Sequence, residues 1–508
     1  MAKLAEHGLE PLIVLSFAHH LYDGGLTPFS AEGRDGYAHY GRAVLDRYGS
    51  QILAVEIWNE YNGSFCEGPC RDDRPTSYAN MLEQAYRALK SSRPNVTVIG
   101  GATAGIPLTY LETVFQKGGL HFVDALSVHP YGSTPEDVGK EIGDLRGLAA
   151  HYGHPDLPIW ATEFGHGKPS AAGRREAARY LVRMCTALLA VGVDRLYWYL
   201  LRDYREFEGM GLLHGPESDL GRYAPTPAYA AYANLIHQLG EARFVRRDAG
   251  DARAPVYLFA RHGQEVRVAW TSDPPAKLRL DSNERLVVLD MVGRQTMTID
   301  KGSTGILVLD STPVYIVGSV RSIAAIGRGK VLADSVDDYS DQQGKAGWSY
   351  GYHDGTGADD GLNSAAYDID EFQQMVPATD AWRRKWGQPR YPWLAIGLRD
   401  AHPSRSAERP IWAIRRWTSP ASGPVRISGH IIHAAQQGDG VTAHIAVDGR
   451  LVLSANLGGA WGTQEIEYDV KANLRSGSRV DFIVTPGLHG DINFDSTTFE
   501  ARIIRDAS

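Results

Sequence analysis

Six short β-rich runs alternate with longer helical patterns over the first half of this 508-residue chain, and this alternation limits the fold more than any other feature. Each run is apolar along most of its length, as is typical of strands buried on both faces of a sheet. Helical patterns separate the runs, for example at 76–92 and 175–192. The β-rich runs cover residues 11–17, 52–58, 96–101, 125–131, 157–164 and 195–200. This alternation predicts a parallel α/β sheet.

A (β/α) barrel is favoured over an open doubly wound sheet for residues 1–242. Polar side chains gather at the carboxyl ends of several runs, which is where TIM barrels carry their active sites. No Gly-x-Gly-x-x-Gly motif opens a helix in this region, so a dinucleotide-binding fold loses its best support. We therefore expect a (β/α)8-type TIM barrel and no nucleotide cofactor.

Two of the runs have a glutamate at or just after their carboxyl end. In "AVEIWNEYNG" at 54–63, Asn59 and Glu60 directly follow the apolar run, and "PIWATEFGHG" at 158–167 carries Glu163 near the end of its run. The run between them ends in His129 and Tyr131, and the last run carries Trp198. In a parallel barrel these strand ends converge, so the five residues Glu60, His129, Tyr131, Glu163 and Trp198 are expected to ring one pocket. Each alone has an ordinary explanation, such as a helix cap or a core histidine, but together they favour a site.

Two carboxylates that face each other across a pocket are the equipment of glycoside hydrolysis. One must donate a proton to the leaving oxygen, and the other must stay anionic to attack the anomeric carbon. Asn59 is expected to bond the sugar 2-hydroxyl, Tyr131 to donate to the Glu163 carboxylate, and Trp198 to form the floor under the reacting sugar. Two more residues at strand ends, His20 and Trp58, complete the predicted substrate contacts. A retaining enzyme would place the carboxyl groups roughly 5–5.5 Å apart.

At these motifs the chain resembles the clan A glycoside hydrolases, which are retaining enzymes on TIM barrels. The resemblance rests on "WNE" at 58–60, "HPY" at 129–131, "TEFG" at 162–165 and "YWY" at 197–199. It covers roughly residues 10 to 240, including the barrel-closing segment at 209–235, and family 39 is the most similar family. The resemblance implies that Glu60 is the acid/base and Glu163 the nucleophile.

One departure from that family concerns the start of the barrel. If the run at 11–17 is the third barrel strand, the first two βα units are absent, together with the arginine that contacts the nucleophile in the clan; Arg202 is a candidate to replace it. The resulting barrel is incomplete, with two open edges. Because a symmetric contact would cover both copies of such a gap, a homo-oligomer is expected.

The sequence of the second half of the chain predicts an all-β structure. Alternating patterns and turns predict an accessory β-sandwich at 243–328 and a jelly roll at 329–508, which resembles a carbohydrate-binding module. Five tryptophans there could form either a sugar-binding platform or part of the core. They are Trp348, Trp382, Trp386, Trp393 and Trp417.

Charge, composition and cysteines exclude several classes of partner. The net charge of -8 argues against nucleic acid and anionic membranes, and no apolar run of 18 residues predicts a membrane span. No metal is expected, because the acidic segment at 354–361 fits no EF-hand spacing and the cysteines lack a second Cys/His pair. Cys66 and Cys70 form a disulfide or remain free thiols, and Cys185 is expected to be buried.

The predicted partner is a poly- or oligosaccharide. The leading hypothesis is a retaining glycosidase that cleaves a β-glycosidic bond; a non-catalytic carbohydrate-binding protein and a lyase or transglycosylase are the alternatives. The first residues lack the apolar segment of a signal peptide, so they predict no location. An extracellular or periplasmic location is expected if the natural start lies upstream.

Overall fold

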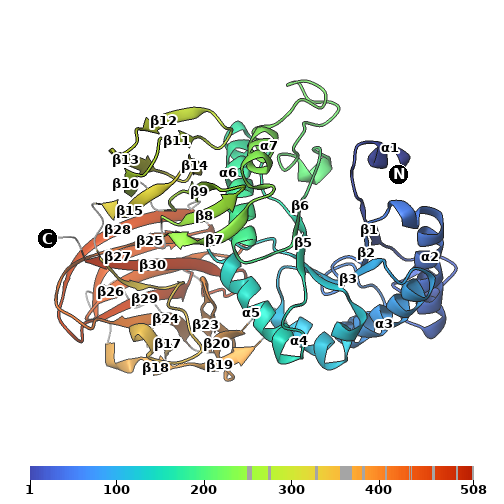
Figure 1. The fold of residues 1–508 in the computed structure, drawn as a ribbon. Coiled ribbons are helices and arrows are strands. Elements are labelled where there is room, and N and C mark those ends of the chain that lie inside the picture. Colours follow the sequence, from blue (N-terminus) through green and yellow to red (C-terminus); the bar gives the residue numbers. More distant parts are fainter. Residues whose placement is uncertain are drawn as a thin grey trace. The chain divides into compact units, whose positions relative to one another are not determined.

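The chain forms two compact units, Met1–Ile326 and Gly327–Ser508. The structure is a computed structural model (Figure 1). It describes residues 1–248, 254–272, 276–326, 330–354, 369–379, 384–406, 409–433, 435, 437–459, 464–487 and 490–505.

The first unit begins with a parallel sheet in which strand order follows chain order, β1-β2-β3-β4-β5-β6. All six predicted strands are present, which confirms the parallel α/β prediction. Their bounds are β1 Leu12–Leu15, β2 Ala54–Ile57, β3 Thr97–Ala104, β4 Ala125–His129, β5 Ile159–Phe164 and β6 Arg195–Trp198. Since every neighbouring pair is parallel, all the strands end at the same edge of the sheet.

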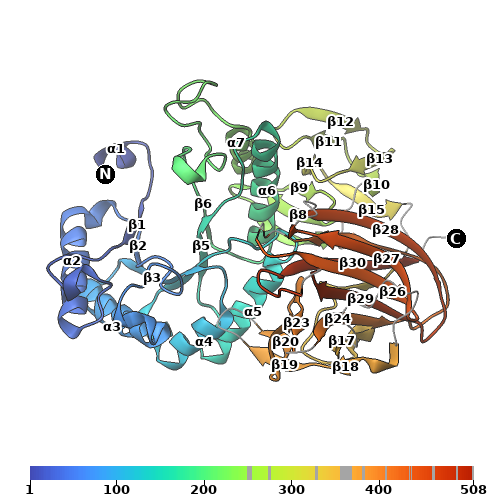
Figure 2. The same cartoon turned by 180° about the vertical axis from the view of Figure 1, so that it is seen from behind.

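Helices connect these strands and cover the outer face of the sheet. Three of them start at a side-chain cap, where Ser30, Asp73 or Ser170 accepts a hydrogen bond from a backbone N–H in the first turn. Helices α2 to α6 follow one another around the sheet in both views (Figures 1 and 2). The bounds are α1 Ala2–Glu6, α2 Ala31–Tyr48, α3 Arg74–Ser92, α4 Leu108–Gln116, α5 Val138–His151, α6 Ala171–Ala190 and α7 Pro227–Leu239.

The inner face of the sheet changes from apolar to polar along the strands. At the amino ends, a buried cluster contains Ala54, Ile99, Ala125 and Trp160, with Leu12 and Tyr197 packed against it. Further along, the inward positions are polar and buried: Glu56, Ser127 and Thr162. The sheet therefore has a closed apolar base and a polar layer directed toward the carboxyl ends of the strands.

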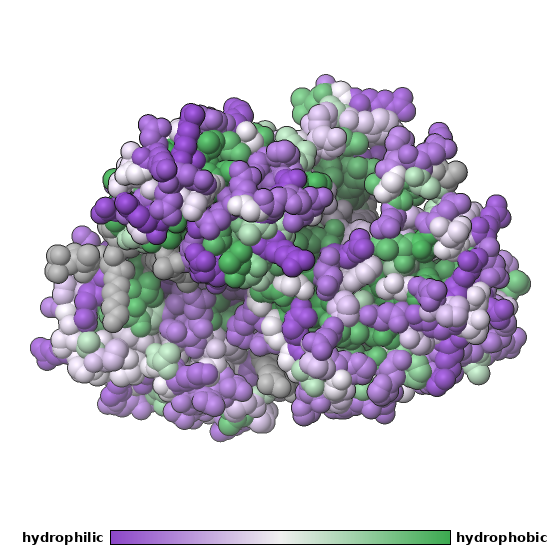
Figure 3. All heavy atoms as spheres, in the orientation of Figure 1, coloured by the Kyte–Doolittle hydropathy of each residue, from purple (hydrophilic) through white to green (hydrophobic). Residues whose placement is uncertain are grey.

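The sheet is open in the described part of the chain, where β1 and β6 each pair with a single neighbour. Val14 on β1 and Phe17 just after it are 37% and 51% exposed, although a closed barrel would bury inward apolar residues. Apolar residues surround the hollow between the two ends of the sheet (Figure 3). Six parallel strands with this open side fit an incomplete TIM barrel.

A β-sandwich completes the first unit. Its two antiparallel sheets have the orders β12-β11-β14-β9-β8-β7 and β13-β10-β15. Trp270 after β9 donates to Glu136 Oε1 at 2.8 Å, and Arg183 of α6 pairs with the same oxygen at 2.5 Å, so the sandwich is anchored to the barrel. The strands are β7 Arg243–Asp248, β8 Val256–Arg261, β9 Gln264–Ala269, β10 Ala276–Ser282, β11 Leu286–Leu289, β12 Gln295–Ile299, β13 Thr304–Leu309, β14 Val314–Val317 and β15 Val320–Ile326.

The second unit is built from two antiparallel sheets around a separate core. One sheet has the order β19-β20-β21-β22-β30-β25-β28, with β16 beside β30; the other has the order β18-β17-β24-β29-β26-β27, with β23 beside β24. The strands are β16 Lys330–Asp334, β17 Trp348–Asp354, β18 Gln373–Gln374, β19 Val376–Thr379, β20 Arg384–Gln388, β21 Tyr391–Ile396, β22 Asp400–His402, β23 Ser404–Arg405, β24 Pro410–Thr418, β25 Gly423–Ile432, β26 Val441–Val447, β27 Arg450–Leu457, β28 Glu465–Leu474, β29 Arg479–Pro486 and β30 Thr497–Arg505.

Most of the tryptophans singled out in this unit belong to its core. Trp348, Trp386 and Trp417 are at most 2% exposed, so they cannot form an open sugar platform. Trp393 is 66% exposed and stays available for stacking. Trp382 and most of the acidic segment at 354–361 lie outside the described residues.

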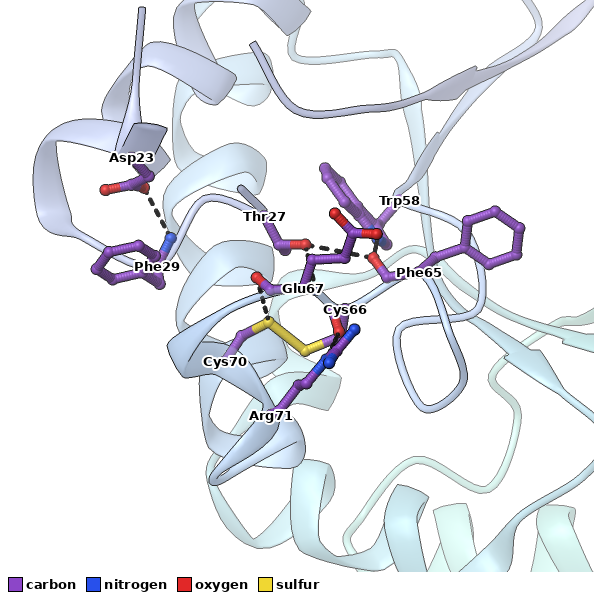
Figure 4. Close-up of a disulfide and its surroundings, with 9 residues drawn as sticks. All are labelled: Asp23, Thr27, Phe29, Trp58, Phe65, Cys66, Glu67, Cys70 and Arg71. Carbon is purple, nitrogen blue, oxygen red and sulfur yellow. Dashed lines mark hydrogen bonds between the residues drawn. A yellow bond between two sulfur atoms is a disulfide. The ribbon is translucent and has the colours of Figure 1, made fainter. Parts of the chain in front are cut away.

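Cys66 and Cys70 form a disulfide in the loop after β2, which confirms the bridged alternative (Figure 4). The same loop is held to its surroundings by hydrogen bonds. Trp58 Nε1 donates to the Phe65 carbonyl at 3.0 Å, and the Glu67 N–H donates to Thr27 Oγ1 at 2.8 Å. Cys185 is a buried free thiol, as expected.

Removing this disulfide should measurably destabilise the first unit. For so short a loop the chain-entropy model gives a loss of about 2 kcal/mol for the double variant Cys66→Ser/Cys70→Ser. Urea unfolding followed by circular dichroism measures the loss. Reductant should lower the stability of the parent protein to that of the variant and leave the variant unchanged; a reductant effect of equal size on both would contradict the prediction.

Candidate active site

The loop that carries Glu60 is held in an unusual backbone conformation. Trp58 and Glu60 have φ angles of 68° and 43°, in the left-handed region that non-glycine residues seldom adopt. The Glu60 N–H donates to the Ala102 carbonyl at 2.6 Å. The Asn62 amide exchanges two hydrogen bonds of 3.0 Å with the backbone of Ala104. Because such conformations cost about 1–3 kcal/mol each, these contacts with β3 are what keep Glu60 in place.

His129, the last residue of β4, lies between Glu60, which follows β2, and Glu163 of β5. Its Nδ1 is 3.1 Å from Glu60 Oε1 and 3.8 Å from Glu163 Oε2. The three ligand-type atoms lie within 4.8 Å of one another, so one oxygen of Glu60 is within that distance of one oxygen of Glu163. The imidazole is fully buried, whereas the glutamates are 20% and 25% exposed. The carboxylates therefore face the solvent side of a buried histidine.

Tyr131 contacts Glu163, whereas Trp198 contacts the next residue along the strand, Phe164. The Tyr131 hydroxyl donates to Glu163 Oε2 at 3.3 Å. Trp198 is the strand neighbour of Phe164 and is half-buried, and its Nε1 donates to the Met210 carbonyl at 2.9 Å. The structure thus brings together Glu60, His129, Tyr131 and Glu163, whereas the Trp198 ring packs against Phe164 and Tyr180.

Among the described residues, the three that remain of those predicted to contact the substrate form no hydrogen bond or ion pair with the two glutamates. Trp58 is 1% exposed and packs against Phe17, Tyr37 and Tyr61, so its indole is part of the core. Asn59 is half-buried next to Glu60. His20 is exposed in the loop after β1, where it stacks on His19 with ring centroids 4.4 Å apart.

Glu56 is a third carboxylate beneath the pair, and the sequence analysis did not single it out. It is 1% exposed, and Thr162 Oγ1 donates to its Oε1 at 2.7 Å. Burial raises the pKa of Glu56, while His129, Ser127 and Thr162 oppose that rise. Its place inside the apolar run "AVEIW" could have pointed to it, because acidic side chains are almost never fully buried unless they are paired.

The same environment shifts the pKa of Glu163 and of His129. Burial raises the pKa of Glu163, and the charges of Glu60 and Glu56 add to the rise, whereas His129 and Tyr131 act against it. Burial alone would lower the pKa of His129, but the hydrogen bond to the Glu60 carboxylate and the charges of Glu163 and Glu56 raise it above its ordinary value. The two glutamates and Glu56 therefore stabilise the imidazolium form of His129.

His129 is the cationic partner of Glu163 in the described residues, where no Lys or Arg nitrogen lies within 4.0 Å of that carboxylate. Arg202 does not take this place, because its guanidinium lies over the Tyr204 ring at 5.9 Å. The histidine and its two glutamates also form a donor set that a metal ion could occupy.

A parallel βα sheet with two glutamates above its carboxyl edge defines a barrel-type α/β fold of the kind common in hydrolases. Among solved structures, a family 39 glycoside hydrolase from the gut symbiont Bacteroides cellulosilyticus WH2 has a similar fold. It aligns with a TM-score of 0.53 at 22% identity, over 63% of this chain and 69% of that chain. The chain therefore shares its fold with that enzyme.

Two further solved structures align less well. A monomeric β-xylosidase from Caulobacter crescentus CB15 aligns with a TM-score of 0.45 at 18% identity, over 63% of this chain and 83% of that chain. An endoxylanase of glycoside hydrolase family 30 from Clostridium papyrosolvens C71 also has a TM-score of 0.45, at 12% identity, over 63% of this chain and 81% of that chain. No family model and no curated protein matches the sequence.

Proposed function

We propose that this protein is a retaining glycoside hydrolase that cleaves a β-glycosidic bond in a poly- or oligosaccharide. The observation that carries the proposal is the pair Glu60 and Glu163, which face each other within 4.8 Å around the buried His129. Inverting enzymes keep their carboxyl groups about 6.5–9.5 Å apart to admit a water, so the closer spacing supports retention.

In this proposal Glu163 is the nucleophile and Glu60 the acid/base. Glu163 attacks the anomeric carbon while Glu60 gives its proton to the leaving oxygen; Glu60 then takes a proton from the water that hydrolyses the glycosyl-enzyme. Tyr131 orients the attacking carboxylate through its hydrogen bond to Oε2. The Nδ1 of His129 orients Glu60 and can exchange a proton with it. Asn59 is assigned to the sugar 2-hydroxyl and Trp198 to the floor of the pocket.

Turnover of a panel of aryl β-glycosides tests the proposal. Hydrolysis with retained anomeric configuration, seen by NMR at early time points, supports it. Saccharide binding without turnover supports instead a non-catalytic carbohydrate-binding protein with the same pocket. Non-hydrolytic products would indicate a lyase or transglycosylase.

The pH profile should depend on Glu56. Glu163 must be anionic to attack, and its pKa is raised. As the solution is acidified, kcat/KM should therefore begin to fall at a higher pH than it would with a nucleophile of ordinary glutamate pKa. Glu56→Gln removes one of the charges that raise this pKa, and the acid limb of the profile should move to lower pH. Glu67→Gln, at an exposed position, is the control. An acid limb that stays in place in Glu56→Gln would show that Glu56 is uncharged in the active enzyme.

A further inference from the structure

Phe17 and Phe65 form an exposed pair of stacked rings beside the carboxyl edge of the parallel sheet. Phe17 follows β1, and Phe65 lies in the loop after β2. Their ring centroids are 5.3 Å apart and their planes differ by 10°, yet the two residues are 51% and 39% exposed. In contrast, the stacked rings of Tyr257 and Trp270 are buried. Because burying a phenylalanine is favourable, an exposed pair of this kind offers apolar surface to a ligand.

The backbone connects this aromatic pair to Glu60. The Trp58 N–H donates to the Leu15 carbonyl of β1 at 3.1 Å, and the Phe17 ring packs edge-on against the Trp58 indole with centroids 5.7 Å apart. Glu60, which follows Trp58 closely in the chain, bonds in the other direction, because its N–H donates to a carbonyl of β3 at 2.6 Å. Phe17 therefore lies on the β1 side of Trp58 and the Glu60 backbone on the β3 side.

The order of the strands indicates which sugar the aromatic pair contacts. Along the sheet the order is Phe17 after β1, Glu60 after β2 and Glu163 on β5, so the pair adjoins Glu60 rather than Glu163. In the proposed function, on which this step rests, Glu163 attacks the anomeric carbon and Glu60 protonates the oxygen of the leaving group. A sugar on the leaving-group side of the cleaved bond is therefore the one closest to the pair.

Phe65 is held in place before any sugar binds. Its carbonyl oxygen accepts hydrogen bonds from Trp58 Nε1 at 3.0 Å and from Thr27 Oγ1 at 3.3 Å. The Cys66–Cys70 disulfide begins at the next residue, and the Phe65 ring points away from it (Figure 4). A surface that is ordered beforehand binds its ligand at a smaller entropic cost.

We propose that Phe17 and Phe65 form the binding surface for the leaving-group sugar, and that this sugar is a pyranose with an apolar ring face. Glucose, xylose and mannose in β-1,4 linkage are of this class, because their ring C–H groups present a face that packs on an aromatic ring. The protein then acts on saccharides that continue beyond the cleaved bond, and the stacked rings contribute to their affinity.

Calorimetry with tetrasaccharides tests the surface independently of turnover. The β-1,4-linked tetramers of glucose, xylose and mannose are titrated into the Glu163→Gln variant, so that binding is measured without hydrolysis. Adding Phe17→Ala or Phe65→Ala should weaken binding of the tetramer that binds best by about 10-fold, whereas Phe17→Tyr should retain it. Phe494→Ala, at a phenylalanine that is 54% exposed in the second unit, is the matched control and should change nothing.

Kinetics of the active protein distinguish this surface from the catalytic groups. For the tetramer that is cleaved, kcat/KM should fall about 10-fold in Phe17→Ala and in Phe65→Ala. For the glycosyl fluoride of the same sugar, whose leaving group is a single atom, kcat/KM should stay at the parent value. Equal losses on both substrates would overturn the proposal, since they would mean that the rings act through Glu60.

Two further results would overturn the proposal: that none of the tetramers binds, or that both alanine variants bind as tightly as the parent protein. In the second case, turnover by the parent protein would leave the glycosidase assignment standing. Conversely, binding that depends on both rings, without turnover, would retain the sugar-binding surface and reject the glycosidase. Phe17→Leu and Phe65→Leu, which keep an apolar side chain without the ring, replace any alanine variant that does not fold.

Discussion

Replacing Glu163 by Gln is expected to abolish hydrolysis of every glycoside that the protein cleaves, with a loss of kcat on the order of 10⁴-fold or more. The amide has the shape of the carboxylate and can still accept the hydrogen bond that Tyr131 donates at 3.3 Å. It cannot form the covalent bond to the anomeric carbon, so the loss should not depend on the leaving group. Initial rates on aryl β-glycosides with good and poor leaving groups measure this.

Replacing Glu60 by Gln should give a different pattern. Hydrolysis of substrates whose leaving-group oxygen needs protonation should slow by about 10²–10⁴-fold, while substrates with a good leaving group should still form the glycosyl-enzyme. Azide, which needs no general base, should then restore turnover of the activated substrates. Equal losses in both variants on both substrate types would contradict the assigned roles. Glu67→Gln should behave like the parent protein.

The fold was predictable because the strands of a parallel sheet leave a local signal. Runs such as 96–101 and 125–131 are apolar on both faces, and each becomes a strand, β3 or β4, within a few residues of the expected bounds. The site was predictable for the same reason. Since parallel strands end at one edge, Glu60, His129 and Glu163 had to converge whatever the details of packing.

Side-chain environment was harder to predict because it depends on distant parts of the chain. Trp58 adjoins Asn59 in the sequence, yet its indole turns away to bond Phe65 and is buried, while Asn59 stays accessible. Trp348 and Trp417 look as suitable for sugar stacking as Trp393, and only the paired sheets show that they fill the core. The environment of Glu56 likewise includes Thr162, which donates a hydrogen bond to it from 106 residues away in the chain.

Replacing Arg174 by Met is expected to destabilise the first unit by about 3–5 kcal/mol and to lower kcat/KM as well. Arg174 Nη1 on α6 is 2.7 Å from Asp203 Oδ2, and both side chains are less than 10% exposed. Without the guanidinium, the buried Asp203 carboxylate keeps only the more distant His214 Nδ1, 4.0 Å from Oδ2, as an ion-pair partner in the described residues. The other oxygen of Asp203 accepts hydrogen bonds from the N–H groups of Gly209 and Gly211, at 2.9 and 2.8 Å.

The loss of activity should follow from a displacement of the loop at 209–211. The backbone carbonyl of Met210, between the two glycines, accepts the hydrogen bond of Trp198 Nε1 at 2.9 Å. A shifted loop would displace the tryptophan proposed to lie under the sugar, raising KM more than it lowers kcat.

Arg175→Met, at the adjacent exposed position, is the matched control and should change neither stability nor KM. The double variant Arg174→Met/Asp203→Asn keeps an oxygen for the two N–H groups and removes the charge, so it should recover much of the stability and of KM. Urea unfolding and steady-state kinetics test both effects. If Arg174→Met is as stable as Arg175→Met, the buried ion pair does not hold this loop, and the link from α6 to Trp198 is wrong.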